Sequence, residues 1–394
     1  MKAVILCAGK STRTYPFTIS KPKALLPILD KTLIEVSIES LKGIAEEVII
    51  VVGCLKEQII EHLGSTYQGI KITYVEQKEQ LGTGHALMQA RSQLTGKFLV
   101  LNGDDIYSPK DILNCAKHDR CLLGKEVEDP EKWGILLTEG KALKGIQEKP
   151  TEPLSNIGNT GLYVLDKNIF PYLEKTGKSE RGEIEITSAI SEMCKEQTYM
   201  VEKIQDYWLP VSYPWQLLEA NAFFLEKISQ SNIKGIVEAH VTMRGVVVLR
   251  EKSIIKSGCY LEGPVWIGKD CVVGPNAYLR KDTILLDNVR TRSEIVDSLI
   301  MKGTTAKHHS YIGHSIVGEN CNIGAGTITS DYRHDGATNK TIIQGKKVDS
   351  NRRKLGAFIG DGVHTGINTS IYPGRKIWPG KTTVPGEIVK EDIM

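Results

Sequence analysis

Long apolar runs, aromatic residues and an excess of one charge sign are all scarce in this sequence. No apolar run in the 394 residues approaches the roughly eighteen that a membrane-spanning helix needs, so we predict no membrane partner. Fifty lysines and arginines against 47 aspartates and glutamates leave a net charge of +3, which is too small to predict nucleic-acid binding. Any attraction for phosphate must therefore be local.

Paired cysteines and a leader segment are missing as well. The eight cysteines form no C-x-x-C pair, the spacing typical of zinc and redox sites, so we expect free thiols. Met1 leads directly into an apolar run without a basic segment or cleavage site, and we expect a cytoplasmic protein. The length allows two or three domains.

Two common nucleotide-binding motifs are absent. Gly9-Lys10-Ser11 could end a Walker A loop, but that motif needs a glycine where this chain has Val4. No G-x-G-x-x-G is present either. A phosphate site in this chain must be built differently.

The stretch 3–28, AVILCAGKSTRTYPFTISKPKALLPI, predicts such a site. It places an apolar strand, a small-residue turn and three cations, Lys10, Arg13 and Lys23, in sequence. Gly9 allows backbone N–H groups to approach a ligand closely, and the prolines favour an extended segment. The structural alternative is a strand followed by a solvated basic loop.

The first half reads as an α/β domain. Strand-like runs at 48–53, 71–75 and 98–101 alternate with helical patterns at 33–41 and 56–63, which predicts a mostly parallel, Rossmann-like sheet. Ligands of such sheets bind at the carboxyl ends of the strands.

Two motifs fall at those ends. A glycine-rich turn at 77–85, QKEQLGTGH, offers amide side chains that can read a base edge. Asp104 follows the apolar strand 98–101, and a carboxylate there suits Mg²⁺. A common turn before a helix and an acidic turn are the plainer interpretations.

The second half has a six-residue repeat. Aliphatic residues recur six apart, with a small or β-branched residue two positions earlier, at Ile255, Leu261, Ile267, Val273 and Leu279. This period matches the left-handed parallel β-helix of hexapeptide-repeat proteins, which generally assemble as trimers. We predict this coil over 232–394 and a linking helix over 214–231. A purely structural coil is the alternative.

A polar insertion at 330–355 interrupts the repeat, and such excursions usually carry a binding face. Just before it stand His308, His309 and Tyr311. A histidine can accept a proton near neutral pH, although a histidine pair is more often a surface feature.

The segments L-x-A-G-K-x-T-R and K-P-K-A-L-L-P-I resemble the signature of the sugar-1-phosphate nucleotidylyltransferases. With the repeat, the chain resembles the bifunctional N-acetylglucosamine-1-phosphate uridylyltransferase/glucosamine-1-phosphate acetyltransferase family in its short archaeal-type form. The resemblance implies nucleotidyl transfer from UTP or dTTP to N-acetylglucosamine-1-phosphate or glucose-1-phosphate, with release of pyrophosphate, by a domain at 1–213. It also implies acetylation of glucosamine-1-phosphate by acetyl-CoA on the coil.

The resemblance also implies roles for individual residues. Arg13 would lie against the triphosphate, Lys23 against the phosphates of the reacting pair, and Asp104 on Mg²⁺. The nucleotide and sugar would be bound by Leu6, Ala8, Gly9, Gln77, Gln80, Gly82, Thr83, Gly134, Glu148 and Asn159.

On the coil, the resemblance makes His308 the base that deprotonates the amine, with Tyr311 orienting the substrate. Arg280 would bind the sugar phosphate, the backbone of Ala325 would stabilise the oxyanion, and Lys340 would reach a neighbouring subunit of a homotrimer or a dimer of trimers. The 352–354 run RRK is a candidate for coenzyme A phosphates on charge alone.

Three positions depart from the family. Pro210 stands where many members have a second magnesium-binding aspartate, so Asp105, Asp206 or water would have to complete the coordination. Val296 replaces a phosphate-binding lysine, and Asp331 replaces an asparagine. These departures keep two alternatives open: a catalytically weakened nucleotide-sugar-binding or assembly protein, and a nucleotidylyltransferase whose coil serves trimerisation alone.

Overall fold

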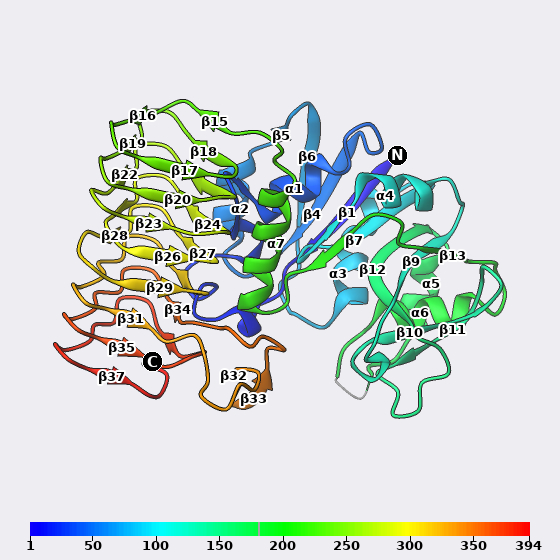
Figure 1. The fold of residues 1–394 in the computed structure, drawn as a ribbon. Helices are drawn as coiled ribbons and strands as arrows, with labels where there is room; N and C mark the ends of the chain where they lie inside the picture. Colours follow the sequence, from blue (N-terminus) through cyan, green and yellow to red (C-terminus); the bar gives the residue numbers. More distant parts are fainter. Residues whose placement is uncertain (180–181) are drawn as a thin grey trace. The chain divides into compact units, whose positions relative to one another are not determined.

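The computed structural model describes residues 1–179 and 182–394, which form two compact units (Figure 1). The first unit contains Met1–Lys10, Pro22–Leu25 and Leu33–Pro210. The second contains Ser11–Lys21, Leu26–Thr32 and Val211–Met394. Within the described residues, no helix combines the length and apolar character that crossing a membrane requires.

A ten-stranded sheet of described residues forms the centre of the first unit, in the order β10-β11-β13-β9-β12-β7-β1-β4-β6-β5. Neighbours among β7, β1, β4 and β6 are parallel, as predicted, while β12 runs antiparallel to both β7 and β9. The strands are β1 (Lys2–Cys7), β4 (Glu47–Val52), β5 (Thr66–Tyr67), β6 (Ile70–Glu76), β7 (Lys97–Asn102), β9 (Cys121–Glu126), β10 (Gly134–Glu139), β11 (Ala142–Glu148), β12 (Ile157–Asp166) and β13 (Met200–Lys203), with a separate pair β8 (Asp105–Tyr107) and β14 (Trp208–Pro210).

Helices cover both faces of this sheet, because strands such as β1 are apolar on both sides. Ala3 and Ile5 pack with α1, α2 and α4 on one face, whereas Val4 packs with α3, α5 and α6 on the other. The helices are α1 (Leu33–Glu39), α2 (Lys56–Leu63), α3 (Thr83–Gln89), α4 (Pro109–Ala116), α5 (Ile169–Lys175) and α6 (Ile186–Met193), with short 3₁₀ turns η3 (Arg91–Gln93) and η4 (Pro130–Lys132).

The segment after β1 is less extended than predicted. It contains two 3₁₀ turns, η1 (Thr12–Thr14) and η2 (Lys23–Leu25). The hydroxyl groups of Thr14 and Thr18 both donate to the Ser11 carbonyl, at 2.8 and 2.7 Å, and close the backbone into turns. The prolines therefore did not keep the whole segment extended. A two-stranded pair, β2 (Pro27–Ile28) and β3 (Lys31–Thr32), follows.

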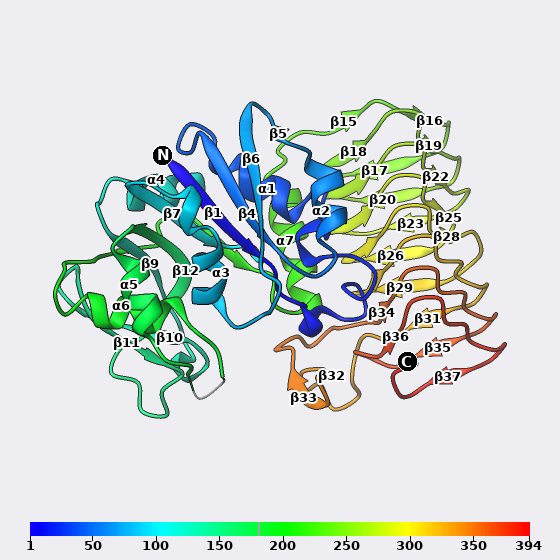
Figure 2. The ribbon, with the colours of Figure 1, turned by 180° about the vertical axis from the view of Figure 1, so that it is seen from behind.

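The second unit is built on the predicted left-handed parallel β-helix (Figure 2). Val247 pairs with Val265 and Val265 with Thr283, so one turn of the coil takes eighteen residues, or three repeats. The predicted residues Ile255, Leu261 and Ile267 are fully buried in its core. Each repeat thus contributes one face of the coil.

Three parallel sheets of described residues make up the coil. Their strands follow in spatial order, sheet by sheet: β15 (Asn232–Ile233), β18 (Val247–Leu249), β21 (Val265–Ile267), β24 (Thr283–Leu285), β27 (Ser298–Ile300), β30 (Ile316–Val317), β34 (Phe358–Ile359) and β36 (Lys376–Ile377); β16 (Ile236–Val237), β19 (Ile254–Ile255), β22 (Val272–Val273), β25 (Arg290–Thr291) and β28 (Thr305–Ala306); and β17 (Thr242–Arg244), β20 (Tyr260–Glu262), β23 (Tyr278–Leu279), β26 (Glu294–Val296), β29 (Tyr311–Gly313), β31 (Ile328–Thr329), β35 (Ser370–Ile371) and β37 (Ile388–Val389).

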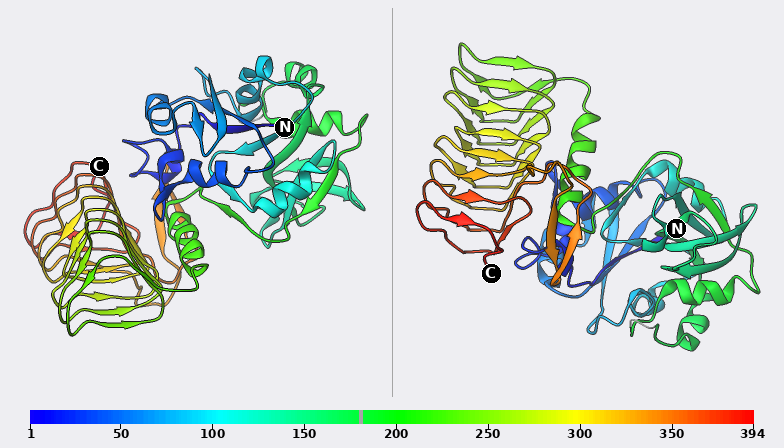
Figure 3. Two further views of the ribbon diagram at one scale, coloured as in Figure 1. Left: turned by 90° about the horizontal axis from the view of Figure 1, so that it is seen from above. Right: turned by 60° about the horizontal axis from the view of Figure 1, so that its bottom comes forward.

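Helix α7 (Pro214–Glu226) runs beside the coil in the second unit (Figure 3). Its Asn221 is fully buried and bonds the short β2–β3 segment: the side-chain oxygen accepts from the Leu29 N–H at 2.8 Å, and the amide donates to the Pro27 carbonyl at 2.9 Å. One buried amide thereby fixes this N-terminal segment to the helix.

The insertion at 330–355 folds as a hairpin of β32 (Lys340–Ile343) and β33 (Lys346–Asp349). It returns to the coil through a bridge between Tyr332 and Lys354. All eight cysteines, which lie in the described ranges, are free thiols, as expected, and Cys54 is the exposed one among them.

Candidate functional sites

Lys23 and Asp104 meet in the first unit. The ammonium group of Lys23 lies 2.9 Å from Asp104 Oδ2, and the lysine side chain is 7% exposed against 32% for the aspartate. η2 carries the lysine, and the turn between β7 and β8 carries the aspartate. A cation and a carboxylate that share a partly buried position suit the binding of phosphate together with a divalent cation.

Asp105, the next residue, lies in a more buried environment than Asp104. It is buried and accepts a hydrogen bond from Asn102 Nδ2 at 3.3 Å, and its Oδ2 lies 3.2 Å from the Tyr107 hydroxyl oxygen. Burial, and then the charge of Asp104, raise the pKa of Asp105 well above its usual 3.8. Asp104, which is 32% exposed, is therefore the more accessible of the two carboxylates.

The predicted sugar-binding residues Gly134, Glu148 and Asn159 lie together. Gly134 is the register partner of Glu148 in the β10–β11 pair. A Cβ on Gly134 would lie 2.9 Å from Glu148 Oε2 and 3.8 Å from Asn159 Cβ. The absence of a side chain at Gly134 thus leaves room beside two groups that can bond hydroxyls.

This group of Gly134, Glu148 and Asn159 is connected to the Asp104 turn. The Tyr107 hydroxyl donates to the Thr160 carbonyl at 2.7 Å. Gly161 has a φ of +82°, and a Cβ there would lie 2.0 Å from Asn102 Nδ2. The two motifs, some fifty-odd residues apart in sequence, therefore approach each other through a position that requires glycine.

The glycine-rich turn is shaped by hydrogen bonds of its own. Gln77 is buried, and its amide donates to the Gly82 carbonyl at 3.1 Å, while Gln80 donates to the Gln77 carbonyl at 3.3 Å. Gly82 precedes α3 with a φ of +105°, and Thr83 Oγ1 accepts from the Ile186 N–H at 3.2 Å. The Gln77 side chain therefore stabilises the conformation of this turn.

Leu6, Ala8 and Gly9 lie at the carboxyl end of β1, where parallel sheets bind ligands. The Gly103 N–H donates to the Leu6 carbonyl at 3.0 Å. A Cβ on Gly103 would lie 2.6 Å from the same carbonyl oxygen. The Asp104 turn is therefore packed directly against the strand that leads into the Gly9 turn.

Arg13 belongs to the second unit. Its guanidinium lies 5.6 Å from the centre of the Tyr213 ring, and Nη2 donates to Ser212 Oγ at 3.4 Å. The Tyr213 ring is stacked on Trp215 at 4.6 Å. Arg13 therefore rests on an aromatic pair at the start of α7.

The residues around Pro210 indicate whether Asp105 or Asp206 could replace the metal-binding aspartate that is missing at this position. Pro210 is the register partner of Asp105, whose side chain is buried and bonded to Asn102. Asp206 accepts from Ser108 Oγ at 2.7 Å, away from this pairing. Within the described residues no group of three or more His, Cys, Asp or Glu side chains is placed to bind a metal. Among these carboxylates, the partly exposed Asp104 could hold Mg²⁺ if phosphate and water supplied the other oxygens.

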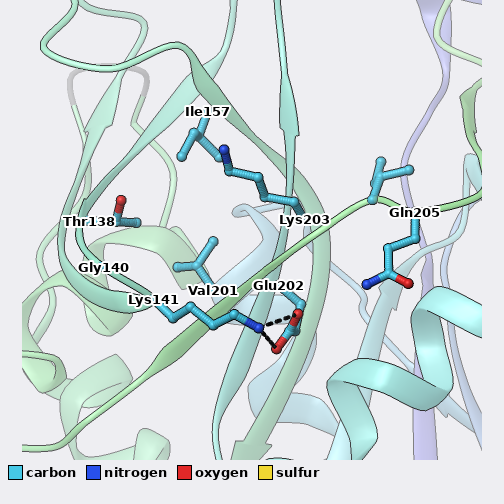
Figure 4. Close-up of a pocket in the computed structure, with 9 residues that line it drawn as sticks. Thr138, Gly140, Lys141, Ile157, Val201, Glu202, Lys203 and Gln205 are labelled. Atoms are coloured by element: carbon cyan, nitrogen blue, oxygen red, sulfur yellow. Dashed lines mark hydrogen bonds and ion pairs between the residues drawn. The ribbon is translucent and has the colours of Figure 1, made fainter.

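A cavity of about 330 Å³ in the first unit lies away from these residues (Figure 4). Lys141 Nζ contacts both carboxylate oxygens of Glu202, at 2.9 and 3.2 Å, on its wall. Its nine lining residues include none of the predicted site residues. Lys203, the other lysine on the wall, pairs with Glu126 at 2.7 Å. Because both lysines are already paired with carboxylates, the cavity is not the predicted phosphate site.

The predicted acetyl-transfer residues of the coil fall partly together. The Tyr311 hydroxyl donates to Asp331 Oδ2 at 2.8 Å. Burial, followed by this bond and the Asp331 charge, raises the pKa of Tyr311. Arg280 pairs with Glu294 at 3.1 Å, and Glu294 is the register partner of Tyr311. Arg280, Tyr311 and Asp331 thus share one region of the coil.

Three residues of this region were not predicted from the sequence. Glu294 neutralises Arg280. Gly313 leaves room for the tyrosine, since a Cβ there would lie 2.5 Å from the Tyr311 hydroxyl and 2.6 Å from Asp331 Oδ2. His314 lies between two carboxylates, 2.7 Å from Asp297 and 3.4 Å from Asp331. The available signals were a glycine two positions and a histidine three positions after Tyr311.

The other predicted residues differ in their surroundings. His308 is exposed, and its carbonyl accepts from Ser293 Oγ at 3.0 Å. Ala325 is half-buried, and Lys340 lies exposed on β32, 4.0 Å from Asp349. Arg352 forms ion pairs with Asp297 and Glu219, so its charge is already matched.

Comparison with known proteins agrees with this architecture. The family described as Nucleotidyl transferase matches residues 2–227. A "Bifunctional protein GlmU" from Methanocaldococcus jannaschii is 42% identical, over 96% of this chain and 92% of the relative. A "Bifunctional sugar-1-phosphate nucleotidylyltransferase/acetyltransferase" from Sulfurisphaera tokodaii is 40% identical, over 100% of this chain and 98% of the relative.

Two solved structures resemble part of the chain. A UDP-glucose pyrophosphorylase complexed with UDP-glucose is 25% identical with a TM-score of 0.53, and covers 58% of this chain and 99% of that one. A putative glucose-1-phosphate thymidylyltransferase from Bacillus anthracis is 29% identical with a TM-score of 0.52, over 57% and 94%. The chain is therefore an enzyme of the nucleotidyl transferase family and belongs, over its whole length, with the bifunctional sugar-1-phosphate nucleotidylyltransferases/acetyltransferases.

Proposed function

We propose that the chain transfers a nucleotidyl group from UTP or dTTP to a sugar 1-phosphate, releasing pyrophosphate, and acetylates an amino-sugar 1-phosphate with acetyl-CoA. The first activity would belong to residues 1–213 and the second to the coil, residues 232–394. The observation that carries the proposal is the Lys23–Asp104 pair beside the Gly134, Glu148 and Asn159 group. The full-length bifunctional relatives support it.

In the nucleotidyl-transfer site, this chain's residues would bind and align two anionic substrates. Glu148 and Asn159 would bond sugar hydroxyls, with the space left by Gly134 admitting the ring. Lys23 and Arg13 would neutralise phosphate charge, which lowers the barrier to attack of the sugar phosphate oxygen on the α-phosphorus. Asp104 would hold Mg²⁺, which supplies additional charge stabilisation when bound.

In the acetyl-transfer site, the exposed imidazole of His308 would take a proton from the substrate amine as that amine attacks the thioester carbonyl. Tyr311, fixed by Asp331, would orient the sugar phosphate, and the Ala325 N–H would stabilise the oxyanion. The exposed Lys340 would act on a neighbouring subunit of a homotrimer.

One arrangement favours a second candidate, nucleotidyl transfer alone. Arg280 is paired with Glu294, and Asp331 places a buried carboxylate in the same region. Both reduce the positive charge available to a sugar phosphate. The coil would then serve assembly.

Paired assays on two variants test the proposal. Pyrophosphate release is measured with UTP or dTTP and a panel of sugar 1-phosphates, and thiol release with acetyl-CoA and glucosamine-1-phosphate. We expect Asp104→Ala to abolish the first activity and spare the second, and His308→Ala to do the reverse. His309→Ala is the matched control for the histidine. Loss of both activities in either variant contradicts two separate sites, and no thiol release by the wild type supports the second candidate.

A further inference from the structure

The outer face of one sheet of the coil is apolar and buried. In strands β18, β21, β24, β27, β30 and β34 the flanking residues point into the coil core, while the alternate ones point outward. These outward residues are at most 5% exposed: Val248, Trp266, Ile284, Leu299, Ile316 and Phe358. An ordinary solenoid face would be polar here, so this face is built to be covered.

The segment 11–21 covers this face at strand β34, through Phe17. Phe17 is 1% exposed and packs edge-on against Phe358, with ring centres 6.3 Å apart. The segment therefore contributes its own core residue to the second unit. Burial of two aromatic rings fixes its position more firmly than exposed contacts would.

Lys21 anchors the end of the same segment. Its ammonium lies 2.5 Å from Glu319 Oε1 and 3.3 Å from Asp361 Oδ2, and its side chain is 12% exposed. Ser20 Oγ also donates to Asp361 Oδ2 at 2.7 Å. Asp361 Oδ1 accepts from the Glu319 N–H at 2.8 Å, so both carboxylates belong to one rigid corner of the coil. A partly buried lysine with two carboxylate partners is a specific connection.

Arg13 lies on this anchored segment. Thr12 Oγ1, directly before it, accepts from Gln344 Nε2 at 2.5 Å, and Arg13 itself rests on Tyr213. Lys10 before the segment and Pro22 after it belong to the first unit. The arginine predicted to meet the triphosphate is thus positioned by contacts to the coil and α7 rather than by the parallel sheet.

We propose that Lys21 is a positioning residue for nucleotidyl transfer: through Glu319 and Asp361 the coil fixes segment 11–21 and thereby Arg13. The coil would then influence nucleotidyl transfer through the position of Arg13, in addition to carrying acetyl transfer. This inference rests on the proposed function, because it assigns Arg13 to the triphosphate. It predicts that a change in the coil alters the reaction of the other site.

The test starts with Lys21→Ala and, from the coil side, Asp361→Asn. The asparagine retains an oxygen for the Glu319 N–H but removes the charge that Lys21 contacts. We expect each to lower kcat/KM for the nucleoside triphosphate by about ten- to a hundredfold, the loss that a small misplacement of a charge-stabilising group causes. Acetyl transfer should remain within about twofold, because His308 and Tyr311 are untouched. Lys21→Arg should restore most of the activity.

A double-mutant cycle separates positioning from general damage. If Lys21 acts through Arg13, Lys21→Ala should change the rate by less than about twofold in an Arg13→Ala background. Lys234→Ala, which removes an exposed ion pair with Glu251 on the same coil, is the matched control. Equal losses with and without Arg13, or an unchanged rate in both Lys21→Ala and Asp361→Asn, overturn the inference. Absence of pyrophosphate release by the wild type would instead overturn the proposed function.

Discussion

Removal of one hydroxyl, by Tyr311→Phe, tests the proposed acetyl-transfer site with little change in side-chain shape. The hydroxyl donates to Asp331 Oδ2 at 2.8 Å, and Asp331 is 9% exposed, so water replaces the lost donor poorly. A hydrogen bond to a charged partner contributes about 1.5–3 kcal/mol. At about 1.4 kcal/mol for each factor of ten, acetyl transfer should fall roughly ten- to a hundredfold.

The assay is thiol release from acetyl-CoA with glucosamine-1-phosphate, run beside pyrophosphate release by the same preparation. Tyr372→Phe, at a tyrosine that is 47% exposed on the same unit, is the matched control and should leave both rates unchanged. An unchanged thiol release in Tyr311→Phe would refute the reasoning that this hydroxyl and Asp331 position the substrate. A parallel fall in pyrophosphate release would indicate a general folding defect instead.

Two further predictions concern stability. Gly161→Ala should lower the free energy of unfolding by about 2–4 kcal/mol, because alanine is strained at this left-handed φ and its Cβ would overlap Asn102. Gly140→Ala, at a φ of +60° with open space around it, is the control and should cost about 1 kcal/mol. Equal urea unfolding midpoints for the two variants would contradict this prediction. Burial lowers the pKa of Lys376 to about 8 from its usual 10.5, so between these pH values the unfolded chain binds the proton that the folded chain releases, and stability rises with pH. Relative to Lys376→Met, the wild type should gain up to about 3 kcal/mol from pH 7 to pH 10 in urea titrations; parallel pH curves would contradict it.

The coil could be predicted from the sequence because its inward positions recur every six residues along the chain. Each aliphatic residue of the repeat, such as Ile255 or Leu261, must face inward whatever surrounds the coil. The outward position has no such rule, so nothing in the sequence period indicated that Trp266 and Phe358 would be buried. Phe358 is covered by Phe17, which lies more than three hundred residues earlier in the chain.

The residues proposed for the nucleotidyl-transfer site could be selected from the sequence, but their geometry could not. Lys23 and Asp104 could be selected because cations and carboxylates at strand ends indicate phosphate chemistry. The approach of Gly134 to Glu148 depends on hairpin register with an irregularity after Leu137, which spacing did not reveal. Arg13 was assigned from a motif, and its contacts with Ser212 and Tyr213 involve residues about 200 positions away.

The distribution of the thiols has a practical consequence. Burial raises the pKa of Cys271 to about 12 and of Cys321 to about 11, so the thiols lining the coil stay protonated and inert at neutral pH. Cys54 is the exposed cysteine among the eight, all within the described ranges. A maleimide dye should therefore label the native protein fastest at Cys54, ahead of the partly buried Cys7 and Cys194. A fluorophore there would provide a reporter on the first unit without any engineered cysteine.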